Sequence, residues 1–345
     1  MDPVTEQWFV DRTWQSPDWT VADLVAAKAG RRVSVVLPAL DEEETVGAIV
    51  AAIVPLTTGA QPLVDELVVI DSGSTDRTVE RAAAAGARVV LRTDVLADLD
   101  PLPGKGEVLW RSLAATNGDL LVYIDSDLVD FDPGFVPALL GPLLTEPGVG
   151  LVKGFYRRPL RLETSDAEAL DSGGGRVTEL LARPLLAALR PELSGIVQPL
   201  GGEYAGTREL LESVPFAAGY GVEIGLLLDT HARLGLAGLA QVNLGVRKHR
   251  NRSLLQLGAM ARQILAAALA RCGTDAGCAL DSGADLVQFV QVSGEWLPSS
   301  TCLQVGERPP MSELASESST QRPREAATER QRGSAMSEVL ARVRR

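Results

Sequence analysis

Residues 122–127 read Val-Tyr-Ile-Asp-Ser-Asp, an apolar, strand-like run that ends in two carboxylates separated by one residue. Positions i and i+2 of a strand point to the same face, so Asp125 and Asp127 can converge on one cation where the strand opens into a loop. Paired hard oxygen ligands of this kind suit Mg²⁺ or Mn²⁺ held together with phosphate oxygens. A pair of this kind in isolation is more often a solvated acidic turn, so the surrounding sequence has to decide.

Around this run, short β-branched stretches alternate with helical patterns. The expected strands are 34–38, 66–70, 88–91 and 120–124, and the expected helices are 43–54, the segment that ends near 85, and 107–116. This alternation predicts an α/β fold of right-handed βαβ units with a mainly parallel sheet. Ligands of such sheets bind beyond the carboxyl ends of the strands. Three polar segments are expected at those ends: Pro38–Glu42, Asp71–Thr75 and Asp125–Asp127.

The second half of the chain is less regular. Residues 149–156 and 239–246 are expected strands, and residues 177–189, 223–234 and 254–271 are expected helices. Beyond about Pro309 hydrophobic periodicity is lost and Ser, Glu, Arg and Gln dominate, which predicts a solvated tail. We therefore expect an N-terminal helical segment (1–30), a Rossmann-like half (31–150), a second half (151–308) and a flexible tail (309–345).

Composition narrows the classes of partner. The 345 residues carry a net charge of −12, with 46% hydrophobic and 23% charged residues, which is typical of a globular protein. Such an acidic chain is a poor candidate for nucleic-acid binding through its overall field, so any cationic site has to be local. No secretory signal and no long apolar run is visible, which predicts no membrane attachment and a cytoplasmic location. The three cysteines match no zinc or disulfide framework.

Two loops of the first half could serve a nucleotide, although each has a structural alternative. Pro38–Glu43 could bracket a nucleobase or could simply be an acidic helix start. Asp71–Asp76 could be a cap with a tight turn, or Asp71 and Ser72 could bind base or ribose. In Pro103–Gly106, Lys105 places a positive charge at a helix start, although the spacing is not that of a P-loop.

The second half supplies candidate anion, metal and acid groups. Gly173–Thr178 combines a glycine-rich turn with Arg176 and Thr178 at a helix start, as a carboxylate or phosphate cradle would. His249 is one of two histidines and stands among four cations, so it is either a metal ligand or part of a basic surface turn. Glu223 lies in an apolar stretch near a helix start, where a buried carboxylate needs a partner or a function. The other histidine, His231, is expected to be structural.

The order of these motifs resembles that of GT-A glycosyltransferases, in which a D-x-D element and its metal hold the leaving diphosphate of a nucleotide sugar. The remainder resembles one family, the actinobacterial glucosyl-3-phosphoglycerate synthases and their mannosyl-transferring relatives, over roughly residues 15–305. The segments that carry this second likeness are Gly173–Leu180, Arg183–Leu193, Gly202–Tyr204, Gly219–Gly225 and Gln241–Arg252. The chain departs from the family pattern at Gly201–Glu203 and Gly206–Arg208, both expected near the sugar pocket.

The resemblance implies retaining hexosyl transfer from a nucleotide-diphosphate sugar to the 2-hydroxyl of D-3-phosphoglycerate, by a homodimer that uses Mg²⁺ or Mn²⁺. It implies that Asp127 and His249 are metal ligands and that Glu223, Lys105 and Asp125 are catalytic. The implied donor contacts are Pro38, Leu40, Glu42, Ser72, Lys105, Asp125, Ser126, Leu200 and Tyr220. The implied acceptor contacts are Gly175, Arg176, Thr178 and Asn251.

The sequence offers no obvious carboxylate pair at glycosidase separation, which favours front-face attack by the acceptor hydroxyl over double displacement. Glu223 is the candidate to orient or help deprotonate that hydroxyl. UDP-glucose is the expected donor, and transfer from GDP-mannose or GDP-glucose is the alternative. A nucleotidyltransferase is disfavoured because Pro38–Asp41 lacks a Gly-rich, cationic signature. A transferase with a lipid or polysaccharide acceptor is a more distant alternative, and a non-enzymatic binding module is the least favoured.

Overall fold

The computed structural model describes residues 2–157, 175–246, 253–273, 285–292, 295–303 and 305–314. Within these ranges eight strands form one sheet, in which β7 runs antiparallel to both neighbours and all other neighbours pair in parallel. This confirms the α/β class and the mainly parallel sheet. The order across the sheet is β1 (Thr13–Trp14), β9 (Leu239–Val246), β6 (Leu151–Arg157), β7 (Tyr204–Thr207), β5 (Leu120–Tyr123), β2 (Val33–Ala39), β3 (Glu66–Asp71) and β4 (Arg88–Leu91).

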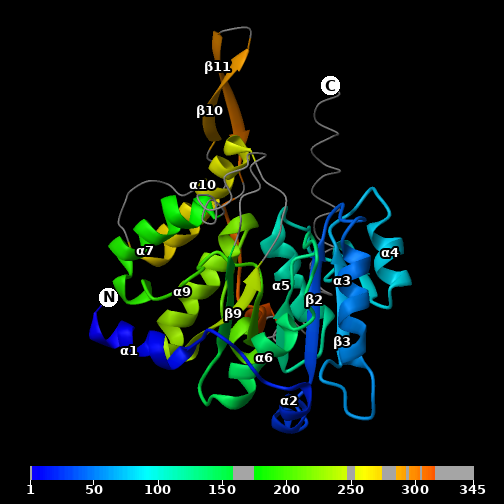
Figure 1. Cartoon of the computed structure of the whole chain (residues 1–345). Coiled ribbons are helices and arrows are strands. Elements are labelled where there is room, and N and C mark those ends of the chain that lie inside the picture. The colour runs from blue at the N-terminus through cyan, green and yellow to red at the C-terminus, as the bar shows by residue number, and fades with distance from the viewer. Residues whose placement is uncertain are drawn as a thin grey trace, which may run out of the picture.

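Helices cover both faces of the sheet, and each face has its own apolar core (Figure 1). Alternate residues of β2 divide between the cores, with Val35 and Leu37 in one and Val36 in the other, as the period of two requires. One core is closed by α2 (Val21–Lys28), α3 (Val46–Ile53), α4 (Thr78–Ala84) and α6 (Phe135–Thr145). The other is closed by α1 (Pro3–Arg12), α5 (Lys105–Ala115), α7 (Arg183–Leu189), α9 (Val222–Leu234) and α10 (Leu254–Arg271).

Short elements connect these layers. They are the helix α8 (Arg208–Glu212), the π-helix η3 (Thr178–Ala182), and the 3-10 helices η1 (Val54–Thr57), η2 (Arg92–Asp94), η4 (Pro191–Leu193), η5 (Gly219–Gly221) and η6 (Leu236–Gly238). A hairpin of β10 (Asp285–Val292) and β11 (Glu295–Cys302) stands away from the body beyond α10 (Figure 1). None of the described helices has the length and apolar character that crossing a membrane requires.

The expected boundary at residue 150 is not a break in the sheet. β6, β7 and β9 from the second half continue the sheet that β2–β5 begin, and β1 from the N-terminal segment pairs with β9 at its edge. The two halves therefore share one sheet. Sequence patterns predict β9 and α10 with their observed bounds. They miss the helix α6, which contains Pro142, and the antiparallel strand β7.

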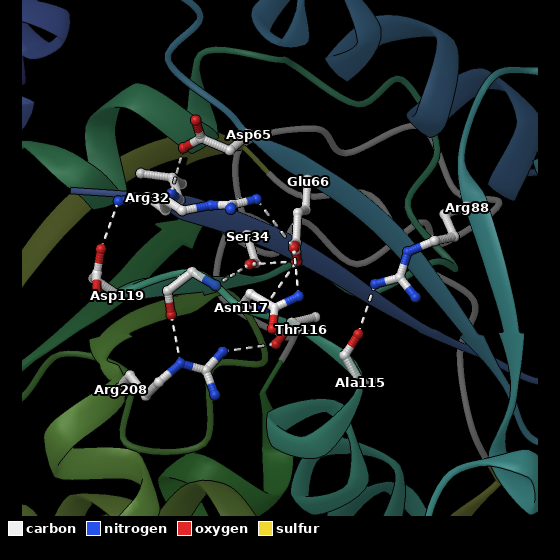
Figure 2. A network of polar contacts seen from close by, with 12 residues as sticks. Arg32, Ser34, Asp65, Glu66, Arg88, Ala115, Thr116, Asn117, Asp119 and Arg208 are labelled. Carbon is white, nitrogen blue, oxygen red and sulfur yellow. Dashed lines mark hydrogen bonds and ion pairs between the residues drawn. The ribbon is translucent and has the colours of Figure 1, made fainter. Parts of the chain in front are cut away.

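A polar network closes the edge of the sheet where β2, β3 and β5 begin (Figure 2). Glu66 accepts hydrogen bonds from the Ser34 hydroxyl at 2.9 Å and from the backbone and side chain of Asn117 at 3.1 Å. Arg208 donates to the Gly118 carbonyl at 2.6 Å and to the Thr116 hydroxyl at 3.0 Å. Because β7 is antiparallel to β5, Thr207 pairs with Leu120 at the start of β5. The expectation that Gly206–Arg208 lies near the sugar pocket is therefore wrong: this segment stabilises the opposite edge.

The C-terminal segment 305–314 forms a strap across α5. Its strand β12 (Glu307–Arg308) pairs with β8 (Phe216–Ala217), and Arg308 Nε lies 2.7 Å from Glu107 Oε2. The indole of Trp110 donates to the Pro309 carbonyl at 2.9 Å. Met311 and Leu314 then pack against the core beneath α5 and α9. The expectation that the tail begins at residue 309 is therefore wrong, because the packed chain continues to Leu314. Residues 315–345 lie outside the described residues.

Glu107 is the electrostatic anchor of this strap. It is buried with Arg111, whose Nε lies 2.6 Å from Glu107 Oε1. Burial alone would raise the pKa of the Glu107 carboxyl, but hydrogen bonds from Arg308 and Arg111 outweigh burial and hold that pKa below its ordinary value. The ionised pair therefore stabilises the folded chain at neutral pH.

Truncation tests the strap. We expect a chain ending at Leu314 to unfold with the full-length midpoint, whereas one ending at Gly306 should lose about 3 kcal/mol or more of unfolding free energy. Urea unfolding measures both. Since the folded-state pKa of Glu107 is lowered, the difference should be full at neutral pH and should shrink as the pH falls below about 4. Equal stability of the two chains would contradict the assignment.

Candidate active site

The polar segments predicted at strand ends do meet at one edge of the sheet. β2 pairs with β3 and β5, with Ala39 opposite Asp71 and Val36 opposite Tyr123. The carboxyl ends of these three parallel strands are thus adjacent. The antiparallel β7 begins at the same edge, so the residues before Tyr204 join the site as well.

The D-x-D loop is anchored by its middle residue. The buried Ser126 donates its hydroxyl to the Pro38 carbonyl at 2.5 Å, and its own carbonyl accepts from the Thr45 hydroxyl at 2.5 Å. Thr45 is the N-cap residue of α3, but its side chain makes no cap hydrogen bond and holds this loop instead. With Ser126 turned inward, Asp125 and Asp127 stay partly exposed on either side of it, as the i, i+2 spacing predicts.

Lys105 joins two carboxylates from distant parts of the chain. Its Nζ lies 2.5 Å from Asp125 Oδ1 and 2.7 Å from Glu223 Oε1, and all three side chains are largely buried. Burial would lower the pKa of Lys105, but the charges of Asp125 and Glu223 outweigh it and raise that pKa well above its ordinary value. Lys105 is therefore a permanent cation and cannot act as a general base.

Close backbone contact places Lys105 there. A Cβ on Gly106 would lie 1.9 Å from the Ala217 carbonyl oxygen, so only glycine lets α5 start against β8 and η5. Glu223 lies in the first turn of α9, directly after η5. The predicted catalytic residues Lys105, Asp125 and Glu223 are thus brought together from three distant parts of the chain.

The two loops that are predicted to bind the nucleoside are hydrogen-bonded to each other. Asp71 accepts from the backbone of Gly73 at 2.8 Å and of Ser74 at 3.0 Å, which favours the structural interpretation of that carboxylate. Asp41 has a positive φ of 55° and accepts from the backbone of Thr75 at 2.8 Å. This cross-loop link was not apparent in the sequence. It fixes the loop of Pro38, Leu40 and Glu42 against the loop of Ser72. The side chain of Leu40 is exposed.

The predicted acceptor contacts begin at Gly175, which has a positive φ of 80°. Arg176 follows in the first helical turn, and Thr178 is buried at the start of the π-helix η3. Helices with such bulges are frequent at functional sites. α10 packs against both η3 and η5, so this segment and Tyr220 flank the same helix. The predicted metal ligand His249 and acceptor contact Asn251 lie outside the described residues.

Sequence patterns gave Lys153 and Tyr204 no role in the site and placed Glu203 only near the sugar pocket. All three side chains are buried behind Asp125 and Glu223. The signal was a lysine between the apolar residues of strand β6, where alternation predicts a buried position. Leu200 is partly buried just before them, packed against the core that α5 and α9 cover.

Comparisons with known proteins agree with this geometry. A family model of glycosyl transferase family 2 matches residues 34–164. The chain is 63% identical over 308 residues to glucosyl-3-phosphoglycerate synthase of Mycolicibacterium smegmatis, covering 89% of this chain and 98% of that one.

Solved structures of glucosyl-3-phosphoglycerate synthase from Mycobacterium tuberculosis are also similar. One, in complex with Mn²⁺, UDP-glucose and phosphoglyceric acid, has a TM-score of 0.77 and 56% identity and covers 88% of this chain and 98% of that one. Another, with Mg²⁺ and UDP, has a TM-score of 0.78 and 56% identity and covers 88% of this chain and 99% of that one.

The mainly parallel sheet, the D-x-D edge and these matches define a glycosyltransferase with the GT-A fold. Within that class, the chain belongs to the family of glucosyl-3-phosphoglycerate synthases.

Replacing Lys105 tests the central ion bridge. In Lys105→Met, two carboxylates remain close together without their cation, so transfer should slow by about 100-fold or more. The change should appear in kcat rather than only in the donor KM. Steady-state kinetics measure this, and Arg77→Met, which removes an exposed cation paired with Glu43, is a matched control. Wild-type turnover in Lys105→Met would exclude the bridge from catalysis.

Proposed function

We propose that the protein transfers glucose from UDP-glucose to the 2-hydroxyl of D-3-phosphoglycerate with retention of anomeric configuration. The observation that carries the proposal is Lys105 bridging Asp125 of the D-x-D edge to Glu223 of the second half. This bridge joins the donor side to the acceptor side. The complexes of the M. tuberculosis enzyme with UDP-glucose and phosphoglyceric acid support the same pair of substrates.

The donor and the cation would lie over the strand ends. The fixed loops around Pro38, Leu40, Glu42 and Ser72 would hold the nucleoside, with Ser126 supporting them from below and Leu200 and Tyr220 on the sugar side. Asp127, together with His249, would hold Mg²⁺ or Mn²⁺, because a partly exposed carboxylate at a strand end offers the hard oxygen that these ions prefer. When bound, the cation supplies positive charge to the leaving diphosphate.

The acceptor would lie over the helix start on the other side. Gly175, Arg176, Thr178 and Asn251 would bind the carboxylate and phosphate of 3-phosphoglycerate. Arg176 lies in the first turn of a helical segment. There the free backbone N–H groups and the guanidinium group, which can donate two parallel hydrogen bonds, favour anions. A local cationic cradle explains how a chain with a net charge of −12 would bind a small anion.

The ion bridge favours front-face attack. Asp125 and Glu223 are both paired to Lys105, which makes either carboxylate a poor nucleophile toward the anomeric carbon. In this proposal the bond to the diphosphate breaks as the acceptor oxygen bonds to the same face of that carbon. Glu223 accepts a hydrogen bond from the attacking hydroxyl and orients it, and the proton leaves with the departing diphosphate.

We also propose a cytoplasmic homodimer. The β10–β11 hairpin pairs only with itself among the described strands, and an isolated two-stranded hairpin is marginally stable in water. Val287 on this hairpin is half exposed, which suits contact with a second copy. The cytoplasm is where a nucleotide sugar and a phosphorylated three-carbon acid are available together.

A donor panel tests the function. The wild-type protein is incubated with 3-phosphoglycerate, Mg²⁺ or Mn²⁺, and UDP-glucose, GDP-glucose or GDP-mannose in turn. We expect the highest kcat/KM with UDP-glucose, an α-linked product by NMR, and loss of activity in excess chelator. A preference for GDP-mannose above tenfold, about 1.4 kcal/mol, would make it a mannosyl-transferring enzyme. No product from any donor would refute the proposal.

Acceptor selectivity should depend on Arg176. We expect Arg176→Ala to raise the KM for 3-phosphoglycerate about 10- to 100-fold while the donor KM changes little, since a charge-assisted bidentate contact is lost. Arg183→Ala is the matched control in the same helical segment, because Arg183 pairs with Glu179 at 2.9 Å. Equal effects on both substrates would assign Arg176 to the donor or to folding.

A further inference from the structure

Lys153 is a buried cation with no role among the predicted site residues. It lies in the middle of β6, opposite Tyr204 of β7 and Gln241 of β9, and is 2% exposed. Its Nζ donates to the Gly201 carbonyl at 2.6 Å and lies 4.7 Å from the centroid of the Tyr204 ring. A buried ammonium is costly unless it is compensated, so its place in the sheet calls for a physical reason.

The carbonyl that Lys153 holds belongs to a loop wedged against Asp125. A Cβ on Gly202 would lie 2.2 Å from Asp125 Oδ2, and one on Gly201 would lie 2.8 Å from the Gly154 carbonyl oxygen. The loop therefore fills the space between β6 and the Asp125 carboxylate. On its other side Asp125 contacts Lys105. Asp125 is thus confined between the loop that Lys153 fixes and the cation that reaches Glu223.

The charges in this region are nearly balanced. Burial lowers the pKa of Lys153 to about 8; Glu223, Glu203 and Asp125 act to raise it and Lys105 to lower it. Two buried cations thus accompany three carboxylates behind the strand ends. Loss of Lys153 would both free the Gly201 carbonyl and leave the carboxylates with less compensation.

We propose that Lys153 is a positioning residue for the transfer reaction: by holding the Gly201 carbonyl it fixes the Leu200–Gly202 loop, and this loop sets the place of Asp125 in the Lys105 bridge. The inference rests on the proposed function, because its effect is read from the transfer. It predicts a loss of turnover without a loss of substrate binding, since Lys153 touches neither the nucleoside loops nor the acceptor helix.

Lys28 provides a matched control. It is another buried lysine that donates to a backbone carbonyl, that of Pro62 at 2.9 Å, and it pairs with Asp65 at 2.6 Å. Asp65 directly precedes β3, at the edge of the sheet opposite the site. Lys28→Met therefore reproduces the cost of removing a buried ammonium without touching the Asp125 loop.

The experiment compares Lys153→Met, Lys28→Met and Gly202→Ala with UDP-glucose, 3-phosphoglycerate and Mn²⁺. We expect Lys153→Met to lower kcat about 10- to 100-fold while both KM values stay within about threefold. The Kd for UDP with Mn²⁺ should also stay within about threefold, by calorimetry. Lys28→Met should lower the thermal midpoint and leave kcat unchanged. Gly202→Ala, which pushes on Asp125 directly, should reproduce the kcat loss even if Lys153→Met does not fold.

Several outcomes would overturn the proposal. They are wild-type kcat in folded Lys153→Met, wild-type kcat in Gly202→Ala, or an equal kcat loss in Lys28→Met. In the double variant Lys153→Met/Gly202→Ala, kcat should fall little below that of the less active single variant, because both changes act through Asp125. Losses of kcat that multiply fully would also count against the proposal. Absence of product with the wild-type protein would instead refute the proposed function, so the two failures are distinguishable.

Discussion

The ammonium of Lys105 between Asp125 and Glu223 is the constraint on which the rest of the site depends. A buried lysine that contacts two carboxylates has to lie at hydrogen-bond distance from both of them. Otherwise the attraction does not offset the cost of removing the charges from water. Lys105 comes from the start of α5, Asp125 from the end of β5 and Glu223 from the start of α9. The close approach of Gly106 to Ala217 fixes the start of α5 against β8, and the strap of residues 305–314 braces both of these elements.

The antiparallel strand β7 is the second determinant. It lies between two sets of parallel strands and brings the Leu200–Glu203 loop to the edge where β2, β3 and β5 end, while Arg208 fixes the opposite edge. One strand thus supplies the loop beneath Asp125 and an anchor for the start of β5. The two halves of the chain are consequently two parts of one sheet.

Much of the fold and of the first half of the site could be predicted from sequence, because the relevant signals are local. The carboxyl ends of parallel strands share an edge, so the positions of Pro38, Ser72 and Asp125 followed from the strand pattern alone. The partner of Lys105 could not be found in this way, because Glu223 lies on a helix much later in the chain. Lys153 was missed for the same reason: its strand was expected, but its Gly201 contact depends on a strand direction that alternation does not encode. Residues 309–314 of the strap were expected to belong to the tail, because a single helical turn shows no periodicity.

The strap also bears on how the enzyme is made. It is synthesised after every other described element, yet it braces α5 and β8, the elements that lead to Lys105 and Glu223. Chains emerge and fold from the N-terminus, so the nucleoside loops can take shape while the ribosome is still translating the second half. A nascent chain can therefore complete its sheet before α5 and β8 are braced. The segment that completes the packing behind the ion bridge is thus the last described segment to leave the ribosome.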